Sequence, residues 1–105
     1  MTTLRQNPTL ADYQRYVADL ERQRGFIDQT VLQKCLLLGE EVGELFKAVR
    51  KLEKMPLEAH QRVGTVDEEI ADIMIYLCSI ANRTGVDLET AFRKKEEVNK
   101  TRVWS

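Results

Sequence analysis

The sequence contains few of the residues that usually build disulfide or zinc domains. Cys35 and Cys78 are the only cysteines in 105 residues, and they form no CxxC pair. The single histidine, His60, stands in a polar stretch, so we give it no role. Disulfide scaffolds and thiolate–histidine zinc sites are therefore excluded, and we expect two buried free thiols in a reducing compartment.

Long apolar runs and an excess of either charge are also lacking. The longest apolar run, from Ile73 to Ala81, is far too short to span a bilayer, and no charged-then-apolar signal opens the chain. Sixteen basic and 17 acidic residues give a net charge of −1, which provides no general attraction for nucleic acid or anionic membranes. We expect a cytoplasmic protein with neither a nucleic-acid nor a membrane partner.

Only two prolines and five glycines occur, and most of them stand where helices should begin or end. Apolar residues recur at three- and four-residue steps in four segments, and no strand-like alternation of useful length is present. The expected N-caps are Thr9, Asp28, Thr65 and Asp87, while Gly25 and Gly85 are expected to end helices. The sequence thus predicts one all-α domain over residues 1–105, a four-helix bundle-like fold preceded by a loose segment, 1–8.

Two of the predicted helices carry carboxylates within their apolar stripes. In the helix that we expect to reach about residue 54, Glu41 falls inside the stripe and Glu44 lies at its border. In the next helix, Glu69 and Asp72 repeat the same i, i+3 spacing, which places both on one face. Because an unpaired buried charge is very costly, something must neutralise these groups.

An antiparallel packing of these two helices would bring the four carboxylates together. Four carboxylates cannot remain ionised side by side in a core without cations or protons. A ligand set made only of oxygen, with no histidine or thiolate, favours Mg²⁺ or Mn²⁺ over zinc. The alternative is that these acids are exposed or salt-bridged, as charges on helices usually are. The repetition of the pair on two helices favours the metal site.

The last predicted helix, from Leu88 to about Thr101, carries a complementary set of polar side chains. Lys95, Asn99 and Arg102, at i, i+4 and i+7, share a helix face with apolar residues that we expect to turn inward, among them Phe92. Two cations and an amide suit a polyphosphate bridged to carboxylate-bound metals. Alternatively, Lys95 and Arg102 pair directly with the acidic cluster or extend into water.

These strings resemble the motifs of a known enzyme family. Residues 40–45, EEVGEL, and 68–72, EEIAD, resemble the EExxE and ExxD metal-binding motifs of the MazG-like nucleoside triphosphate pyrophosphohydrolases, and Lys95 with Asn99 resembles their K-x-x-x-N motif. The resemblance covers about residues 36–104. It implies a MazG-type all-α domain that hydrolyses a (deoxy)nucleoside triphosphate to the monophosphate and pyrophosphate. It also implies Mg²⁺, with Mn²⁺ as a possible substitute, held by Glu41, Glu44, Glu69 and Asp72.

The resemblance further implies roles for individual side chains. Tyr76 would contact the nucleotide, and Lys95 and Asn99, with Arg102 nearby, would hold its phosphates or sugar. Either Glu40 or Glu41 would take the proton from the attacking water. Because the helical wheel separates the two by about 100°, we expect Glu40 to lie in the outer shell of the metal or to act as the base, and not to be a direct ligand. The aromatic residues available for base stacking are Tyr16, Phe26, Tyr76 and Trp104.

Four short helices leave little wall around a nucleotide, so we expect a homodimer or homotetramer, as the resemblance also implies. The predicted role is the clearing of unwanted nucleotides from the cellular pool. Two alternatives remain open. One is a non-catalytic helical module whose acidic stripes bind a basic protein partner. The other is a family member that binds nucleotide without turnover.

Overall fold

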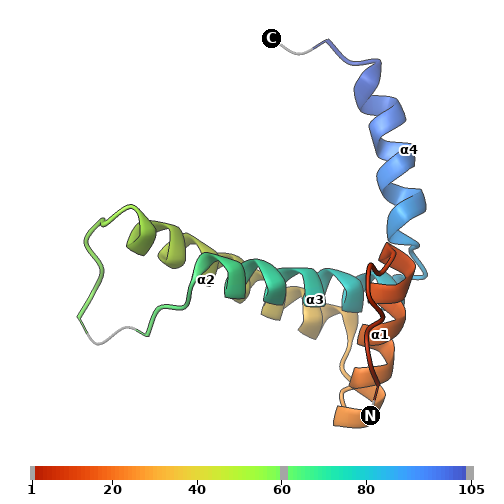
Figure 1. Cartoon of the computed structure of the whole chain (residues 1–105), viewed down its shortest axis with the longest axis horizontal. Coiled ribbons are helices and arrows are strands. Elements are labelled where there is room, and N and C mark those ends of the chain that lie inside the picture. Colours follow the sequence, from red (N-terminus) through yellow and green to blue (C-terminus); the bar gives the residue numbers. More distant parts are fainter. Residues whose placement is uncertain (1, 60–61, 104–105) are drawn as a thin grey trace.

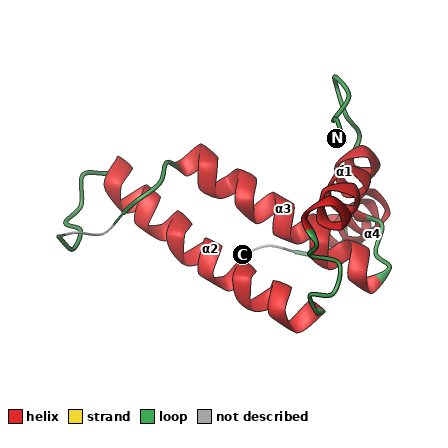
Figure 2. Cartoon of the chain, turned by 90° about the horizontal axis from the view of Figure 1, so that it is seen from below, coloured by secondary structure: helices red, strands yellow, loops and turns green. Residues whose placement is uncertain are grey.

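The computed structural model describes residues 2–59 and 62–103, and this part of the chain contains four helices and no strand (Figure 1, Figure 2). The helices are α1 (Leu10–Arg24), α2 (Val31–Leu52), α3 (Val66–Thr84) and α4 (Leu88–Lys100). None of the helices in the described ranges is long and apolar enough to cross a bilayer. The predicted all-α class is therefore confirmed. His60 and Trp104 lie outside the described residues.

Local chemistry sets most of the helix ends where the sequence predicts them. Thr9 and Asp12 form a reciprocal capping box at the start of α1, and Asp87 accepts the backbone N–H of Thr90 at the start of α4. Gly25 and Gly85 end α1 and α3 in the left-handed conformation, with φ of 74° and 68°. Glycine adopts this conformation without the steric cost of a Cβ.

One predicted cap is wrong, and a second stands where it is predicted but lacks the usual side-chain bond to the backbone. Thr30, not Asp28, caps α2, because Thr30 and Gln33 have the spacing that lets each side chain bond the other's backbone N–H. Thr65 does stand at the N-cap of α3, but its hydroxyl donates to the carboxylates of Asp67 and Glu68 instead of accepting a backbone N–H. Ionised carboxylates in the first turn are the stronger partners for this hydroxyl.

α3 is the central helix, as its wide apolar surface predicts. It lies beside α2 in an antiparallel hairpin, and α1 crosses it at the end of the hairpin away from the α2–α3 loop (Figure 1, Figure 2). Cys78 is buried in this core, but Cys35 on α2 is exposed, so the expectation of two buried thiols is half wrong. The buried apolar side chains are mostly small and come from all three helices: Val17, Leu20, Ala48, Cys78 and Ala81.

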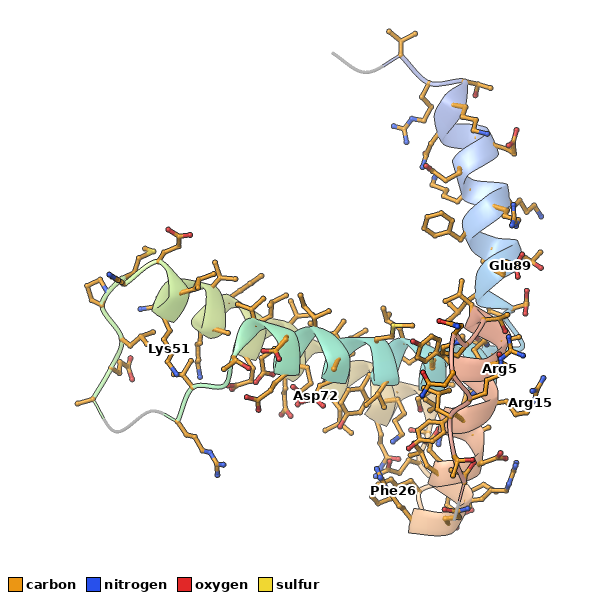
Figure 3. The ribbon with its side chains drawn as sticks, viewed as in Figure 1. Arg5, Arg15, Phe26, Lys51, Asp72 and Glu89 are labelled. Atoms are coloured by element: carbon orange, nitrogen blue, oxygen red, sulfur yellow. The ribbon has the colours of Figure 1, made fainter. Side chains whose placement is uncertain are left out.

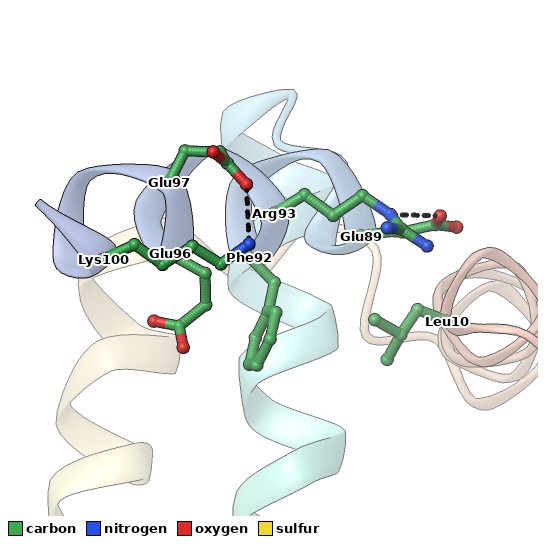
Figure 4. Close-up of a pocket in the computed structure, with 7 residues that line it drawn as sticks. All are labelled: Leu10, Glu89, Phe92, Arg93, Glu96, Glu97 and Lys100. Atoms are coloured by element: carbon green, nitrogen blue, oxygen red, sulfur yellow. Dashed lines mark hydrogen bonds and ion pairs between the residues drawn. The ribbon is translucent and has the colours of Figure 1, made fainter.

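α4 leaves this three-helix unit and points away from the α2–α3 hairpin (Figure 1). It packs against the start of α1, where Leu10 and side chains of α4 line an open hollow of about 550 Å³ (Figure 4). No residue of α4 is buried, and Phe92 is 68% exposed. The expected inward face of this helix is therefore wrong for a single chain, because nothing in the hairpin reaches it.

The direction of α4 is fixed by a polar clamp at its base. The side-chain amide of Gln14 on α1 donates to the carbonyl of Val86 at 2.8 Å and accepts the N–H of Leu88 at 2.9 Å. Asn82 completes the clamp by donating to the carbonyl of Gln14 at 2.8 Å. Because Gln14 is buried, these bonds satisfy polar groups that water cannot reach, so the α3–α4 turn is held firmly on α1.

Candidate metal centre

Three carboxylates meet on the seam between α2 and α3. Glu41 comes from α2, while Glu69 and Asp72 come from successive turns of α3, and carboxylate oxygens of the three lie within 4.8 Å of one another. Glu69 is buried, Glu41 is half-buried and Asp72 is exposed. In Figure 3, Asp72 extends from the hairpin on the side away from α4. The cluster is therefore buried on the side of Glu69 and open to solvent on the side of Asp72.

The electrostatics of the cluster favour a bound cation. Burial raises the pKa of Glu41 to about 7, and hydrogen bonding to Glu69 and the negative charges of Asp72, Glu69 and Glu44 act in the same direction. A divalent cation at this place would reverse these effects, because it stabilises ionised carboxylates.

One oxygen of the cluster has no protein partner. Glu69 is only 8% exposed, and its Oε2 atom is buried without a hydrogen bond. Buried carboxylate oxygens are normally satisfied, so an orphaned one in an all-oxygen cluster fits a hard cation such as Mg²⁺ or Mn²⁺. The residues present therefore suit the metal that the motifs imply.

The other predicted carboxylates lie beside the cluster, not within it. Glu44 is half-buried one turn along α2, and its Oε1 atom lies 3.5 Å from Nζ of Lys47. Glu40 is exposed. Both charges still reach the site, because Glu44 helps to raise the pKa of Glu41 and Glu40 helps to raise that of Tyr76.

Tyr76 lies between the acidic cluster and a buried lysine. Burial, followed by the charges of Glu41, Asp72 and Glu40, raises the pKa of Tyr76 above its usual range. On the other side, Nζ of Lys34 lies 5.5 Å from the centre of the Tyr76 ring and 5.2 Å from that of Phe26. A cation over a ring face at this distance is attracted by the ring quadrupole.

Lys34 belongs to a second charged cluster, which is not among the residues predicted from the sequence. Its Nζ lies 3.3 Å from the carboxylate of Glu21, which also accepts from Arg83 at 2.8 Å and from the hydroxyl of Ser79 at 3.1 Å. This cluster ties α1, α2 and α3 together. Lys34 stands seven residues before Glu41, and that spacing on one helix face was the available signal.

The predicted phosphate-binding side chains do not reach the acidic cluster within one chain. Lys95 and Asn99 lie on α4 and Arg102 in the turn after it, while the carboxylates lie on the hairpin from which α4 points away (Figure 1). The side-chain amide of Asn99 donates to Glu96 at 2.8 Å, and its Oδ1 atom is buried without a partner. The structure thus brings Glu41, Glu69, Asp72 and Tyr76 together and leaves the α4 residues apart.

The chain is similar in sequence to proteins of one enzyme family. Residues 29–103 match the MazG nucleotide pyrophosphohydrolase domain. The chain is 32% identical over 96 residues to a dATP/dGTP diphosphohydrolase of Salmonella phage PMBT28. The matched region covers 91% of this chain and 28% of that protein. It is 35% identical over 101 residues to human dCTP pyrophosphatase 1. This match covers 90% of this chain and 59% of that protein. The match therefore spans less than two thirds of the length of each of these relatives.

Solved structures give the same result for the fold. A MazG-like pyrophosphohydrolase of cyanophage S-2L, bound to dGDP and three catalytic Mn²⁺ ions per active site, matches 96% of this chain and 87% of its own, with a TM-score of 0.72 and 27% identity. The iMazG protein of Vibrio DAT 722 matches 92% of this chain and 99% of its own, with a TM-score of 0.63 and 30% identity. The chain belongs to the MazG nucleotide pyrophosphohydrolase domain family.

Proposed function

We propose that this chain is a metal-dependent hydrolase that cleaves a (deoxy)nucleoside triphosphate to the monophosphate and pyrophosphate. The observation that carries the proposal is the convergence of Glu41, Glu69 and Asp72, with their carboxylate oxygens within 4.8 Å of one another. The relatives support a deoxynucleotide substrate, since they are named for dATP, dGTP and dCTP. Such an activity would suit the clearing of unwanted nucleotides from the pool.

The proposed ligands of Mg²⁺, or of Mn²⁺ in its place, are Glu41, Glu44, Glu69 and Asp72. Bound divalent ions would offset the charge of the triphosphate and lower the pKa of a coordinated water. Glu40 or Glu41 takes the proton of the attacking water, and Glu40 suits this role because it is exposed beside the cluster. Tyr76 offers its ring and hydroxyl to the nucleotide at the edge of the same site.

We further propose that the active unit is a homodimer or homotetramer in which α4 serves a second copy of the chain. Large apolar side chains are exposed on α2 and α4, including Phe46 at 63% and Phe92 at 68%. Contiguous exposed apolar surface is typical of an interface between subunits. In such an assembly, Lys95, Asn99 and Arg102 bind the phosphates or sugar at the partner's carboxylates.

A cytoplasmic location belongs to the same proposal. Cys35 and Cys78 are both free, one exposed and one buried, and unpaired thiols suit a reducing compartment. Nucleotide pools lie in the same compartment, so substrate and enzyme would meet there.

The activity is tested with a panel of standard and damaged nucleoside triphosphates, measuring pyrophosphate release with and without Mg²⁺. We expect Glu41→Gln and Asp72→Asn to abolish release while circular dichroism stays helical. Either variant with full Mg²⁺-dependent activity would show that the ligand assignment is wrong. Tight nucleotide binding by calorimetry without any product would instead identify a sensor.

The sharing of α4 is tested by mixing two inactive variants. Glu41→Gln damages the carboxylate cluster and Lys95→Ala damages α4, so a mixed dimer regains one intact site only if α4 works on the partner. We expect about one quarter of the wild-type activity after equal mixing, from random pairing of the two chains. A mixture as inactive as its components would show that α4 does not act across the interface.

A further inference from the structure

Gly64 stands against the carboxylate of Glu69, just before α3 begins. A Cβ atom added at Gly64 would lie 2.3 Å from Oε1 of Glu69 and 3.4 Å from its Cδ. Side chains on a helix lean toward its N-terminus, which explains how Glu69 reaches back over the residue before the N-cap. The space that any side chain would need at position 64 is therefore taken by a group of the acidic cluster.

At position 64, the consequence of a substitution comes from this contact and not from the backbone conformation. The glycines with positive φ among the described residues are Gly25 and Gly85, whose conformation disfavours other residues. A Cβ added at Gly39 or Gly43 would meet nothing within 4 Å. Of these glycines, Gly64 is the one at which an added side chain would contact a residue of the acidic cluster.

From this geometry we infer that Gly64 is a positioning residue for Glu69 in the metal centre. Glycine at position 64 leaves the space in which the Glu69 carboxylate lies, because Oε1 occupies the place of a Cβ and Oε2 is buried without a partner. The inference rests on the proposed function, since it assumes that the cluster holds a metal. It assigns the loop before α3, as well as the two helices, a part in setting the ligand geometry.

Because of this contact, we expect a substitution at Gly64 to change the affinity for metal but not the stability of the fold. The atom that an alanine would strike is the far end of a flexible side chain, so Glu69 can rotate to another rotamer while the backbone stays in place. Alanine also restricts the unfolded chain, which favours folding. Gly64→Ala should therefore leave the fold intact and turn a ligand away from the metal.

The test is calorimetric titration of the full chain with Mn²⁺ alone, together with thermal melting of the metal-free protein. We expect Gly64→Ala to weaken Mn²⁺ binding by about 10- to 100-fold, the usual effect of disturbing groups that orient metal ligands. The metal-free melting temperature should stay within about 4 °C of wild type, the shift that corresponds to a small free-energy change. Gly39→Ala, whose Cβ meets open space, is the matched control and should bind Mn²⁺ as wild type does.

A double-mutant cycle shows whether Gly64 acts through Glu69. In a Glu69→Gln background the ligand is already lost, so Gly64→Ala should weaken Mn²⁺ binding no further. An equal loss in both backgrounds, unchanged Mn²⁺ affinity in Gly64→Ala, or a collapse of its metal-free stability would each overturn the inference. If wild type binds no Mn²⁺, the proposed function fails, and a crystal structure of metal-free Gly64→Ala decides the positioning separately. Glu69 still in its original place there would overturn the inference, whereas a rotated Glu69 would support it.

Discussion

Two charged clusters, one spanning α1, α2 and α3 and the other on α2 and α3, differ in how their charges are balanced. In the first, Glu21 is 5% exposed and is contacted by Lys34, Arg83 and the hydroxyl of Ser79. In the second, the charged groups that meet Glu41 are carboxylates, those of Glu69 and Asp72. The first cluster is balanced within the chain, whereas the second is not.

The pKa values of the two glutamates shift in opposite directions for this reason. Burial alone would raise the pKa of Glu21, but hydrogen bonds from Arg83 and Ser79 and the Arg83 charge outweigh it and lower the pKa. For Glu41, burial and the neighbouring acids act together and raise the pKa to about 7. A buried carboxylate surrounded by cations stabilises the fold, while one surrounded by acids needs a proton or a cation from solution.

The largest expected effect comes from breaking the balanced cluster. Glu21→Ala leaves Lys34 and Arg83 without the carboxylate that both of them contact, and Lys34 is only 4% exposed. Removing one partner of a buried pair typically costs about 3–5 kcal/mol. We expect the free energy of unfolding, measured by urea denaturation, to fall by that amount.

The matched control removes a carboxylate from an exposed pair. Glu97 lies 3.0 Å from Nζ of Lys100 on α4, with both side chains at least 70% exposed. Glu97→Ala should change the free energy of unfolding by less than about 0.5 kcal/mol, since exposed pairs contribute little. Equal losses in the two variants would show that Glu21 is no more important to stability than a surface charge.

The unbalanced cluster should respond to pH in the opposite sense. Because the pKa of Glu41 rises from 4.5 to about 7 on folding, its contribution to stability is full below 4.5 and is lost as the pH rises through about 7. Between pH 8 and pH 6, the metal-free protein should therefore gain about 1 kcal/mol of stability on acidification. Glu21, whose pKa is lowered, contributes no such change in this range.

Saturating Mn²⁺ should reverse this trend, because protons and metal compete for the same carboxylates. Thermal melting between pH 6 and pH 8, with and without Mn²⁺, measures how stability changes with pH in the two forms. In Glu41→Gln the metal-free slope should vanish. A slope that persists in this variant would assign the titration to another group.

The sequence predicts the acidic cluster but not its balanced neighbour, and the reason is physical. Helical periodicity places Glu41 on the face that meets Glu69 and Asp72, so a local pattern is sufficient. The burial of Lys34 depends on Glu21 and Arg83, which come from two other helices. A lysine on a helix is usually exposed, so the helix face that Lys34 shares with Glu41 is only a weak sign of burial, and no local pattern identifies the partners of Lys34.

The same contrast applies to the fold. The ends of α1, α3 and α4 follow from residues within a few positions of one another, such as Thr9 with Asp12. The direction of α4 depends on Gln14, which bonds Val86 and Leu88 from more than 70 residues away. Periodicity shows which face of a helix is apolar, but not what will cover it. The apolar face of α4 was therefore wrongly assigned to the core of its own chain.

The smallest expected effect gives the sharpest test of the difference between the two clusters. It comes from replacing one carboxylate oxygen by an amide nitrogen in each of two adjacent glutamates, Glu68 and Glu69. Glu69→Gln replaces a buried charge that meets Glu41 and Asp72, so the metal-free protein should become more stable by about 0.5–1 kcal/mol. Glu68→Gln removes an exposed charge from the first turn of α3, where it accepts from Thr65 and favours the helix dipole, so it should cost a few tenths, about 0.3 kcal/mol. Urea denaturation of the two variants without metal measures the opposite signs. A loss of stability in both would mean that Glu69 is already compensated within the chain, and the distinction between the two clusters would disappear.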